Sequence, residues 1–213
     1  MKLKRLYIIG ASGLGREVES CLEHTPVEQR DWEIAGFLHS YQPGKSPLEG
    51  YPSDYEIVGD WETFPLTKDD YCVIAVADCS WREKIYHALK DKVTFLTYIH
   101  PTSMIYKFAI IGEAVFIAPY CIISTNVKIE NGVMLNSATR IGHDSTIGNF
   151  TSLMADVDVG GWCTIGEKVF MGTKSTLIPH KKIANNAIVG AGAVVIRNVK
   201  EGVTVFGNPA KEI

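Results

Sequence analysis

Aliphatic side chains recur at every sixth position through the second half of the chain, from residue 105 to residue 195. Sixteen successive positions obey this rule, a run that chance would give roughly once in a billion trials. A period of six residues is typical of the flat faces of a parallel β-helix. The positions are Ile105, Ile111, Ile117, Ile123, Ile129, Leu135, Ile141, Ile147, Leu153, Val159, Ile165, Met171, Leu177, Ile183, Val189 and Val195.

Two further columns follow the same period. Four places after each aliphatic residue stands a small or β-branched side chain, with Lys181 as the exception. A large inward side chain beside a small one suits a narrow coil, so Cys121 and Cys163, which fall in the small column, are predicted to pack in the core. Lys181 predicts a turn or a small excursion over residues 179–182. Glycine often follows the aliphatic residue directly, as expected where a chain turns sharply: Gly112, Gly142, Gly148, Gly160, Gly166, Gly172 and Gly190.

The first hundred residues carry a different pattern, in which apolar runs alternate with segments of helical spacing. Alternating strands and helices predict a small parallel α/β domain of Rossmann-like type over residues 1–100, before a β-helix over residues 101–213 that ends in a short tail. A segment rich in Pro, Gly and Ser, residues 41–55, is expected to be a loop. The expected strands are 6–9, 32–38, 71–77 and 93–98, and the expected helices follow Gly15 and span 81–89.

Charge and cysteine content narrow the function classes. The 213 residues include 21 Lys and Arg against 24 Asp and Glu, without a basic run, which argues against a nucleic acid or an anionic membrane as partner. The apolar run Leu6 to Ile9 is too short for a signal peptide or a membrane span, so we expect a cytoplasmic protein without membrane insertion. Five cysteines without a C-x-x-C pair favour reduced thiols over a disulfide framework or a zinc site.

A glycine-rich turn connects the first strand to the first helix. Gly10, Gly13 and Gly15 have the arrangement G-x-x-G-x-G, so the G-x-G-x-x-G dinucleotide fingerprint is not matched. Such a turn can let the backbone approach a phosphate at a helix N-terminus, or can simply be a tight connection. The second expected strand ends in His39 and Ser40 without the acidic residue that would hold the ribose of NAD.

Three segments together carry a family resemblance: GASGLGRE near the start, RIGHDSTIGNF in the repeat and VFGNPAK near the end. Chains with these segments in this order resemble the sugar O- and N-acyltransferases, which acetylate nucleotide-linked amino sugars or sialic acid. The resemblance implies a left-handed coil of three hexapeptides per turn, acetyl-CoA as co-substrate, no metal, and a homotrimer. It also implies a nucleotide-sugar site in residues 1–100 and the acetyltransferase domain in residues 101–213.

The resemblance assigns the chemistry to His143 as general base and to Asp144 as its supporting acid. His143 stands two places after the inward Ile141, so its side chain is expected to point outward. Histidine has a reference pKa of about 6.5, which suits accepting a proton at neutral pH, and a neighbouring carboxylate can fix its tautomer. Without the resemblance, a solvated histidine in a turn would be the simpler interpretation.

The resemblance also implies binding residues. Gly161 aligns with a backbone donor to the thioester carbonyl, although Gly160 and Gly161 can also be only a tight corner. Arg82 either faces the sugar or a phosphate, or caps its helix. The expected acetyl-CoA contacts are Ser152, Gly161, Thr173 and Ala191, where Ser152 replaces a family histidine. The expected acceptor contacts are Ser12, Gly13, Gly15, His39, Ser40 and Ala77, where His39 and Ser40 replace a pair of acids.

The sequence therefore predicts an acetyl-CoA-dependent acetyltransferase that acts on the amino group of a nucleotide-linked sugar for surface glycan synthesis. O-acetylation of a sugar such as sialic acid and a non-catalytic β-helix scaffold stay open as alternatives. A metalloprotein resembling γ-class carbonic anhydrase would need three converging histidines, and the repeat contains only His143 and His180.

Overall fold

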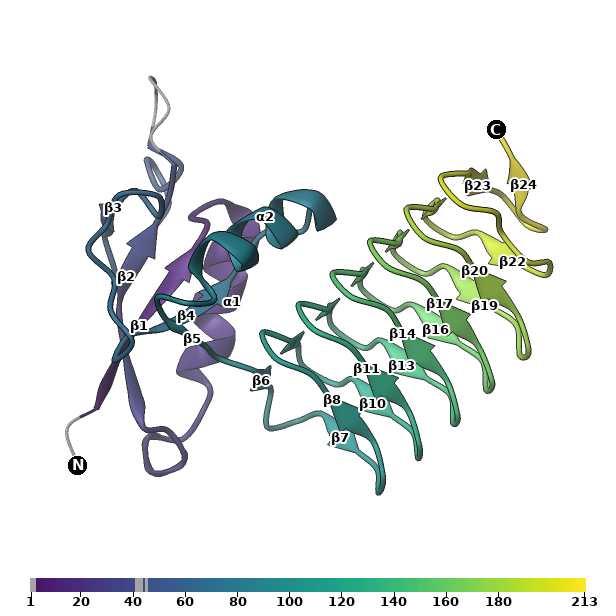
Figure 1. Ribbon diagram of the computed structural model, residues 1–213, viewed down its shortest axis with the longest axis horizontal. Helices are drawn as coiled ribbons and strands as arrows, with labels where there is room; N and C mark the ends of the chain where they lie inside the picture. Colours follow the sequence, from purple (N-terminus) through teal and green to yellow (C-terminus); the bar gives the residue numbers. More distant parts are fainter. Residues whose placement is uncertain (1–2, 41–43, 45) are drawn as a thin grey trace. The chain divides into compact units, whose positions relative to one another are not determined.

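The computed structural model describes residues 3–40, 44 and 46–213 (Figure 1). Two compact units divide the chain: one contains residues 1–77 and 84–96, the other residues 78–83 and 97–213. Helix α2, Cys79–Leu89, is thus shared between them. Within the described residues, no helix is both long and apolar enough to cross a membrane.

The first unit is built on a five-stranded parallel sheet with strand order β3-β2-β1-β4-β5. Its central strand is almost wholly buried, which fits a parallel sheet that is covered on both faces. The elements are β1 Lys4–Ile9, α1 Gly13–Glu23, the 3₁₀ turn Val27–Gln29, β2 Trp32–Leu38, β3 Ile57–Gly59, β4 Tyr71–Ile74 and β5 Thr94–Phe95.

The structure corrects three details of the expected α/β pattern. Strand β3 was not anticipated, because three residues, Ile57–Gly59, are too short to show alternation. Strand β4 ends at Ile74 instead of residue 77. The expected strand over 93–98 divides into β5 in this sheet and β6, Tyr98–Ile99, in the next unit. Residues 41–43 and 45 of the expected loop lie outside the described residues.

The second unit is a left-handed parallel β-helix made of three sheets, here called faces 1, 2 and 3 (Figure 1). Between residues 98 and 195, partner residues in neighbouring parallel strands are 18 apart, as in the pairing of Ile123 with Ile141, which confirms three hexapeptides per turn. The spacing falls to 16 near the end of the coil, as between Ile188 and Thr204. Face 1 has β6 Tyr98–Ile99, β9 Phe116–Ile117, β12 Met134–Leu135, β15 Ser152–Leu153, β18 Phe170–Met171, β21 Ile188–Val189, β23 Thr204–Phe206 and β24 Lys211–Glu212. Face 2 has β7 Met104–Ile105, β10 Ile122–Ile123, β13 Arg140–Ile141, β16 Asp158–Val159, β19 Thr176–Leu177 and β22 Val194–Val195. Face 3 has β8 Ile110–Ile111, β11 Lys128–Ile129, β14 Thr146–Ile147, β17 Thr164–Ile165 and β20 Lys182–Ile183.

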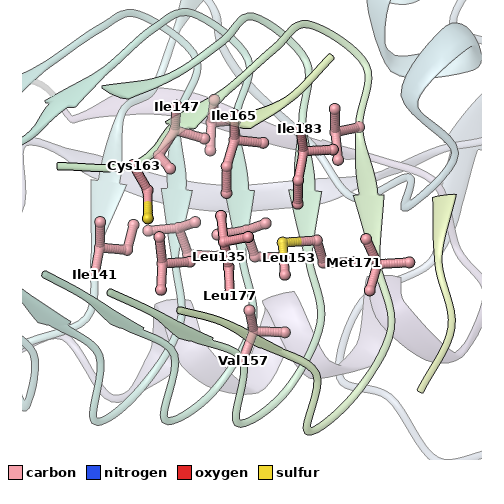
Figure 2. Close-up of a cluster of buried hydrophobic side chains, with 14 of the residues drawn as sticks. Leu135, Ile141, Ile147, Leu153, Val157, Cys163, Ile165, Met171, Leu177 and Ile183 are labelled. Carbon is pink, nitrogen blue, oxygen red and sulfur yellow. The ribbon is translucent and has the colours of Figure 1, made fainter. Parts of the chain in front are cut away.

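The repeated aliphatic residues form the core of the coil. Figure 2 shows side chains such as Ile141, Leu153 and Ile165 pointing from different faces into one interior. Cys121 and Cys163 are buried among them, as predicted, and each thiol contacts a backbone carbonyl. Each fully buried aliphatic side chain contributes on the order of 2 kcal/mol, so the repeat is the main source of stability.

The glycine column has a different role from the one expected. Left-handed backbone angles fall two residues later, at non-glycine positions such as Ala114 and Asp144. The column glycines instead allow adjacent coils to approach closely, since a Cβ on Gly142 would lie 2.6 Å from the Gly161 nitrogen. Glycine is therefore required for spacing between coils and not for a positive φ.

The irregular segment around Lys181 does not interrupt the coil. Residues 179–180 form a turn and β20 begins at Lys182, so of the two alternatives the turn is confirmed and the excursion is wrong. Lys181 is half-buried, because its long side chain can lie along the coil surface while its ammonium group reaches water.

Residues 78–83 belong to the second unit because Arg82 is bonded to the coil. Its guanidinium is buried and donates from Nε to the Gly132 carbonyl (2.6 Å) and from Nη2 to the Phe150 carbonyl (2.6 Å) and Ser152 Oγ (2.8 Å). Glu83 adds an ion pair of 2.9 Å with Lys168. Arg82 is thus a packing anchor, and neither role expected for it, facing the acceptor or capping the helix, describes what it contacts.

Candidate active site

His143 and Asp144 occupy one corner of the coil, between faces 2 and 3. Asp144 has φ +59°, the left-handed conformation that each such corner requires, and this turns both side chains outward. The His143 Nδ1 and Asp144 Oδ2 atoms lie 2.7 Å apart. Asn126, from the preceding coil, donates to the other carboxylate oxygen at 2.9 Å. Almost half of the His143 side chain is exposed, so the ring is accessible from solvent.

The hydrogen bond determines which nitrogen of His143 can accept a proton. An ionised carboxylate only accepts hydrogen bonds, so Nδ1 carries the hydrogen and Nε2 presents a lone pair. Hydrogen bonds from His143 and then from Asn126 lower the pKa of the Asp144 carboxyl below its ordinary value. Asp144 therefore stays ionised at neutral pH and holds this tautomer.

Gly161 lies directly above the imidazole on the next coil. A Cβ at this position would lie 2.9 Å from His143 Nε2 and 3.0 Å from Cε1, so only glycine leaves the ring where it is. Among the described residues, no acceptor bonds to the Gly161 amide, which leaves that N–H available to a ligand. The structure thus brings His143 Nε2 close to Gly161.

Two aromatic residues at the same corner were not singled out from the sequence. The rings of His143 and Trp162 meet edge to face with centroids 4.4 Å apart, and His180 stacks on Trp162 at 4.9 Å. A spacing of 18 residues from Asp144 leads to Trp162 and then to His180, so the repeat period itself contains the signal that would have found them. His180 is therefore part of this corner, through its contact with Trp162.

Ser152 does not join this corner. It lies on β15, on the outer side of face 1, where its hydroxyl is fully buried and accepts the hydrogen bond from Arg82. The Cys79 thiol contacts the same hydroxyl at 3.5 Å. In this chain Ser152 thus serves to anchor Arg82, and its contact with acetyl-CoA stays a prediction without structural support.

Thr173 and Ala191 come together at a different corner of the coil. They are 18 residues apart and both exposed, and the Gly192 amide donates to the Thr173 carbonyl at 2.8 Å. Thr173 follows Gly161 by two hexapeptides, so the three residues cannot converge within one chain. The expected acetyl-CoA contacts are therefore divided between two corners.

The glycine turn of the first unit contains two glycines that its packing requires, Gly10 and Gly15, and one, Gly13, that has free space beside its backbone. A Cβ on Gly15 would clash with the Gly10 carbonyl oxygen, and Gly10 itself has φ +108°. By contrast, a Cβ on Gly13 would lie no closer than 3.9 Å to any other atom, the nearest being in the Arg16 guanidinium. Ser12 and Gly13 are exposed at the start of α1, so only Gly13 has room for a ligand next to its backbone.

His39 and Ser40 follow β2 at the same edge of the sheet, because the carboxyl ends of parallel strands meet there. The Ala11 amide donates to His39 Nδ1 (3.4 Å), which leaves Nε2–H as a donor. Trp61 Nε1 donates to Ser40 Oγ at 2.6 Å. Ala77 follows β4, the other neighbour of the central strand. The expected acceptor residues thus come from three adjacent strand ends.

Within the described part of the chain, no group of three or more His, Cys, Asp or Glu side chains lies where it could hold a metal ion.

Comparisons with known proteins agree with this architecture. Residues 5–89 match the family described as the PglD N-terminal domain. A GDP-perosamine N-acetyltransferase of Escherichia coli O157:H7 is 31% identical over 153 residues, 67% of this chain and 67% of that protein. PerB of Caulobacter crescentus, solved with CoA and GDP-perosamine, is 22% identical with a TM-score of 0.82, covering 98% of this chain and 96% of its own. The acetyltransferase domain of PglB from Neisseria gonorrhoeae FA1090, solved with acetyl coenzyme A, is 22% identical with a TM-score of 0.83, covering 99% and 100%.

Proposed function

Because this chain belongs to the hexapeptide-repeat sugar acyltransferases, we propose that it transfers an acetyl group from acetyl-CoA to the amino group of a nucleotide-linked amino sugar. The observation that carries the proposal is the closeness of His143 Nε2 to Gly161, where an added Cβ would lie 2.9 Å from that nitrogen. One group can take a proton from an attacking amine, and the other can donate to the carbonyl oxygen that becomes negative.

The reaction needs no covalent enzyme intermediate. The sugar amine attacks the thioester carbon, His143 Nε2 takes the proton from nitrogen, and the Gly161 N–H donates to the oxyanion. The C–S bond then breaks, the amide forms, and the proton on Nε2 passes to the CoA thiolate. Asp144 stabilises the imidazolium through Nδ1–H. Cys163 is not placed to act as a nucleophile, since its thiol is buried and burial raises its pKa.

We propose a homotrimer in which acetyl-CoA binds between neighbouring subunits. Gly161 belongs to one corner of the coil, whereas Thr173 and Ala191 belong to another. A second copy would bring the second corner next to the first, and cyclic symmetry would then give three equivalent sites. Light scattering is expected to give three times the mass of the chain, and a stable monomer at micromolar concentration would contradict the proposal.

The acceptor site is proposed at the carboxyl edge of the first sheet. The open Gly13 backbone and the N-terminus of α1 suit the diphosphate of a nucleotide sugar. His39 Nε2–H and the Ser40 hydroxyl suit acceptor atoms of the base or of the sugar. Since nucleotide-linked sugars are precursors of glycans, we place the enzyme in the cytoplasm, in surface glycan synthesis.

Acetyl-CoA is expected to be consumed with an amino sugar linked to one nucleotide, and release of the CoA thiol measures the reaction. A panel of UDP-, GDP-, CMP- and dTDP-linked sugars identifies the base, and mass spectrometry of the product separates an amide from an ester. Acetylation of free sialic acid alone would favour O-transfer. Absence of thiol release with every acceptor would favour a scaffold.

Gly13→Val provides the matched variant for the acceptor. The added side chain meets open space in the protein, so folding should be retained, but it would occupy the proposed position of the phosphate. KM for the nucleotide sugar should rise about tenfold or more while KM for acetyl-CoA is unchanged. An unchanged KM for both substrates would place the acceptor elsewhere.

A further inference from the structure

Trp162 is a large apolar side chain in an exposed position at the catalytic corner. The side chain is 53% exposed in the single chain, at a corner with φ +54°. Its ring lies nearly perpendicular to the imidazole of His143, at 85°, with the two centroids 4.4 Å apart. Edge-to-face contacts of this kind favour one relative orientation of two rings.

His180 supports the indole from the following coil. The two rings are nearly parallel, at 9°, with centroids 4.9 Å apart. Backbone hydrogen bonds fix the coils that carry them, since the Trp162 amide donates to the His143 carbonyl (2.9 Å) and the His180 amide to the Gly161 carbonyl (3.0 Å). The indole is thus in contact with one histidine on each neighbouring coil.

The base needs such a support because a single hydrogen bond leaves the ring free to move. The Asp144 carboxylate restrains Nδ1, but nearly half of the His143 side chain faces solvent, where rotation about the Cβ–Cγ bond would exchange the positions of the ring atoms. Gly161 limits the ring from above. Trp162 supplies the remaining restraint, at right angles to the ring.

We propose that Trp162 is a positioning residue that holds His143 Nε2 toward the Gly161 amide, and that His180 braces it. The inference rests on the proposed function, in which Nε2 accepts the proton of the amine. Acting through His143, Trp162 improves the chemical step and not the binding of acetyl-CoA. Replacing Trp162 is therefore expected to change kcat and to leave KM for acetyl-CoA nearly unchanged.

Three variants test the positioning role. Trp162→Ala should lower kcat about 10- to 100-fold with KM for acetyl-CoA and the melting temperature nearly unchanged. Trp162→Phe keeps an aromatic ring and should recover most of the loss. His180→Ala removes only the brace and should cost about 3- to 10-fold. Phe108→Ala is the matched control, because Phe108 is an exposed aromatic at the same corner, with φ +66°, two coils away from Asp144.

Nuclear magnetic resonance of the free protein gives a readout that does not depend on turnover. The His143 ring should remain protonated on Nδ1 in every variant, because Asp144 sets the tautomer. Its signals should show one ring orientation in the unaltered protein, in Trp162→Phe and in Phe108→Ala, and exchange between orientations in Trp162→Ala. Unchanged His143 signals in Trp162→Ala would overturn the proposal, whether or not kcat falls. If the unaltered protein acetylates no amino sugar, the proposed function fails, and these signals alone decide the positioning role.

Discussion

Replacing His143 with alanine is expected to lower kcat by about 10²- to 10⁴-fold, the range for loss of a general base. His143 Nε2 is the proton acceptor in the proposed step. Gly161, its neighbour on the next coil, offers a backbone N–H but no group that could replace the base. Acetyl-CoA binding should be nearly unchanged, because the exposed imidazole acts on the amine. Steady-state kinetics of thiol release, with titration of acetyl-CoA by calorimetry, measure both quantities.

His87→Ala is the matched control for this experiment. His87 is an exposed histidine in α2 that is not among the proposed site residues, and its removal should leave kcat within about twofold. Full turnover by His143→Ala would rule out His143 as the base. A labelled acetyl group retained covalently on the protein would rule out direct transfer.

Replacing Arg82 with methionine is expected to lower the free energy of unfolding by about 2–4 kcal/mol. Methionine fills much of the same space, but the carbonyls of Gly132 and Phe150 then lose a hydrogen-bond donor inside the protein. Burial lowers the pKa of the guanidinium, so part of the benefit of its hydrogen bonds is offset by lost hydration. Chemical denaturation measures the change.

Arg82→Lys separates the geometry of the guanidinium from its charge, and Arg197→Ala serves as a surface control. Arg82→Lys keeps the charge but cannot reach three acceptors as the planar guanidinium does, so it should also destabilise the protein. Arg197→Ala, at an exposed position, should change the free energy of unfolding by less than about 0.5 kcal/mol. If Arg82→Met were as stable as the unaltered chain, the buried hydrogen bonds would contribute no net stability.

Much of the β-helix could be predicted because its information is local and repeated. Each inward residue, such as Ile147 or Leu177, is six places from the next, so one period specifies the strands, the core and the three faces together. His143 and Asp144 are adjacent in sequence, and the outward direction of His143 follows from its distance to Ile141. Local patterning of this kind is retained in the folded chain.

What depended on contacts between distant segments was not visible in the sequence. Arg82 donates a hydrogen bond to the carbonyl of Phe150, which lies 68 residues further along the chain. The burial of Arg82 therefore depends on a long-range contact. Ser152 is occupied by the same contact. No periodicity marks such a pairing, because it joins two elements whose patterns are unrelated.

The sequence by itself thus determined the repeat, the buried column and the outward direction of His143 beside Asp144, all of which follow from spacings of one to six residues. Only the tertiary structure decided that the column glycines let adjacent coils approach closely, that Arg82 is buried against the coil, and that Trp162 contacts both His143 and His180. The physical reason is that stacking brings residues 18 places apart within a few ångströms. At that distance, side-chain size and ring orientation decide the contact, and the period alone does not.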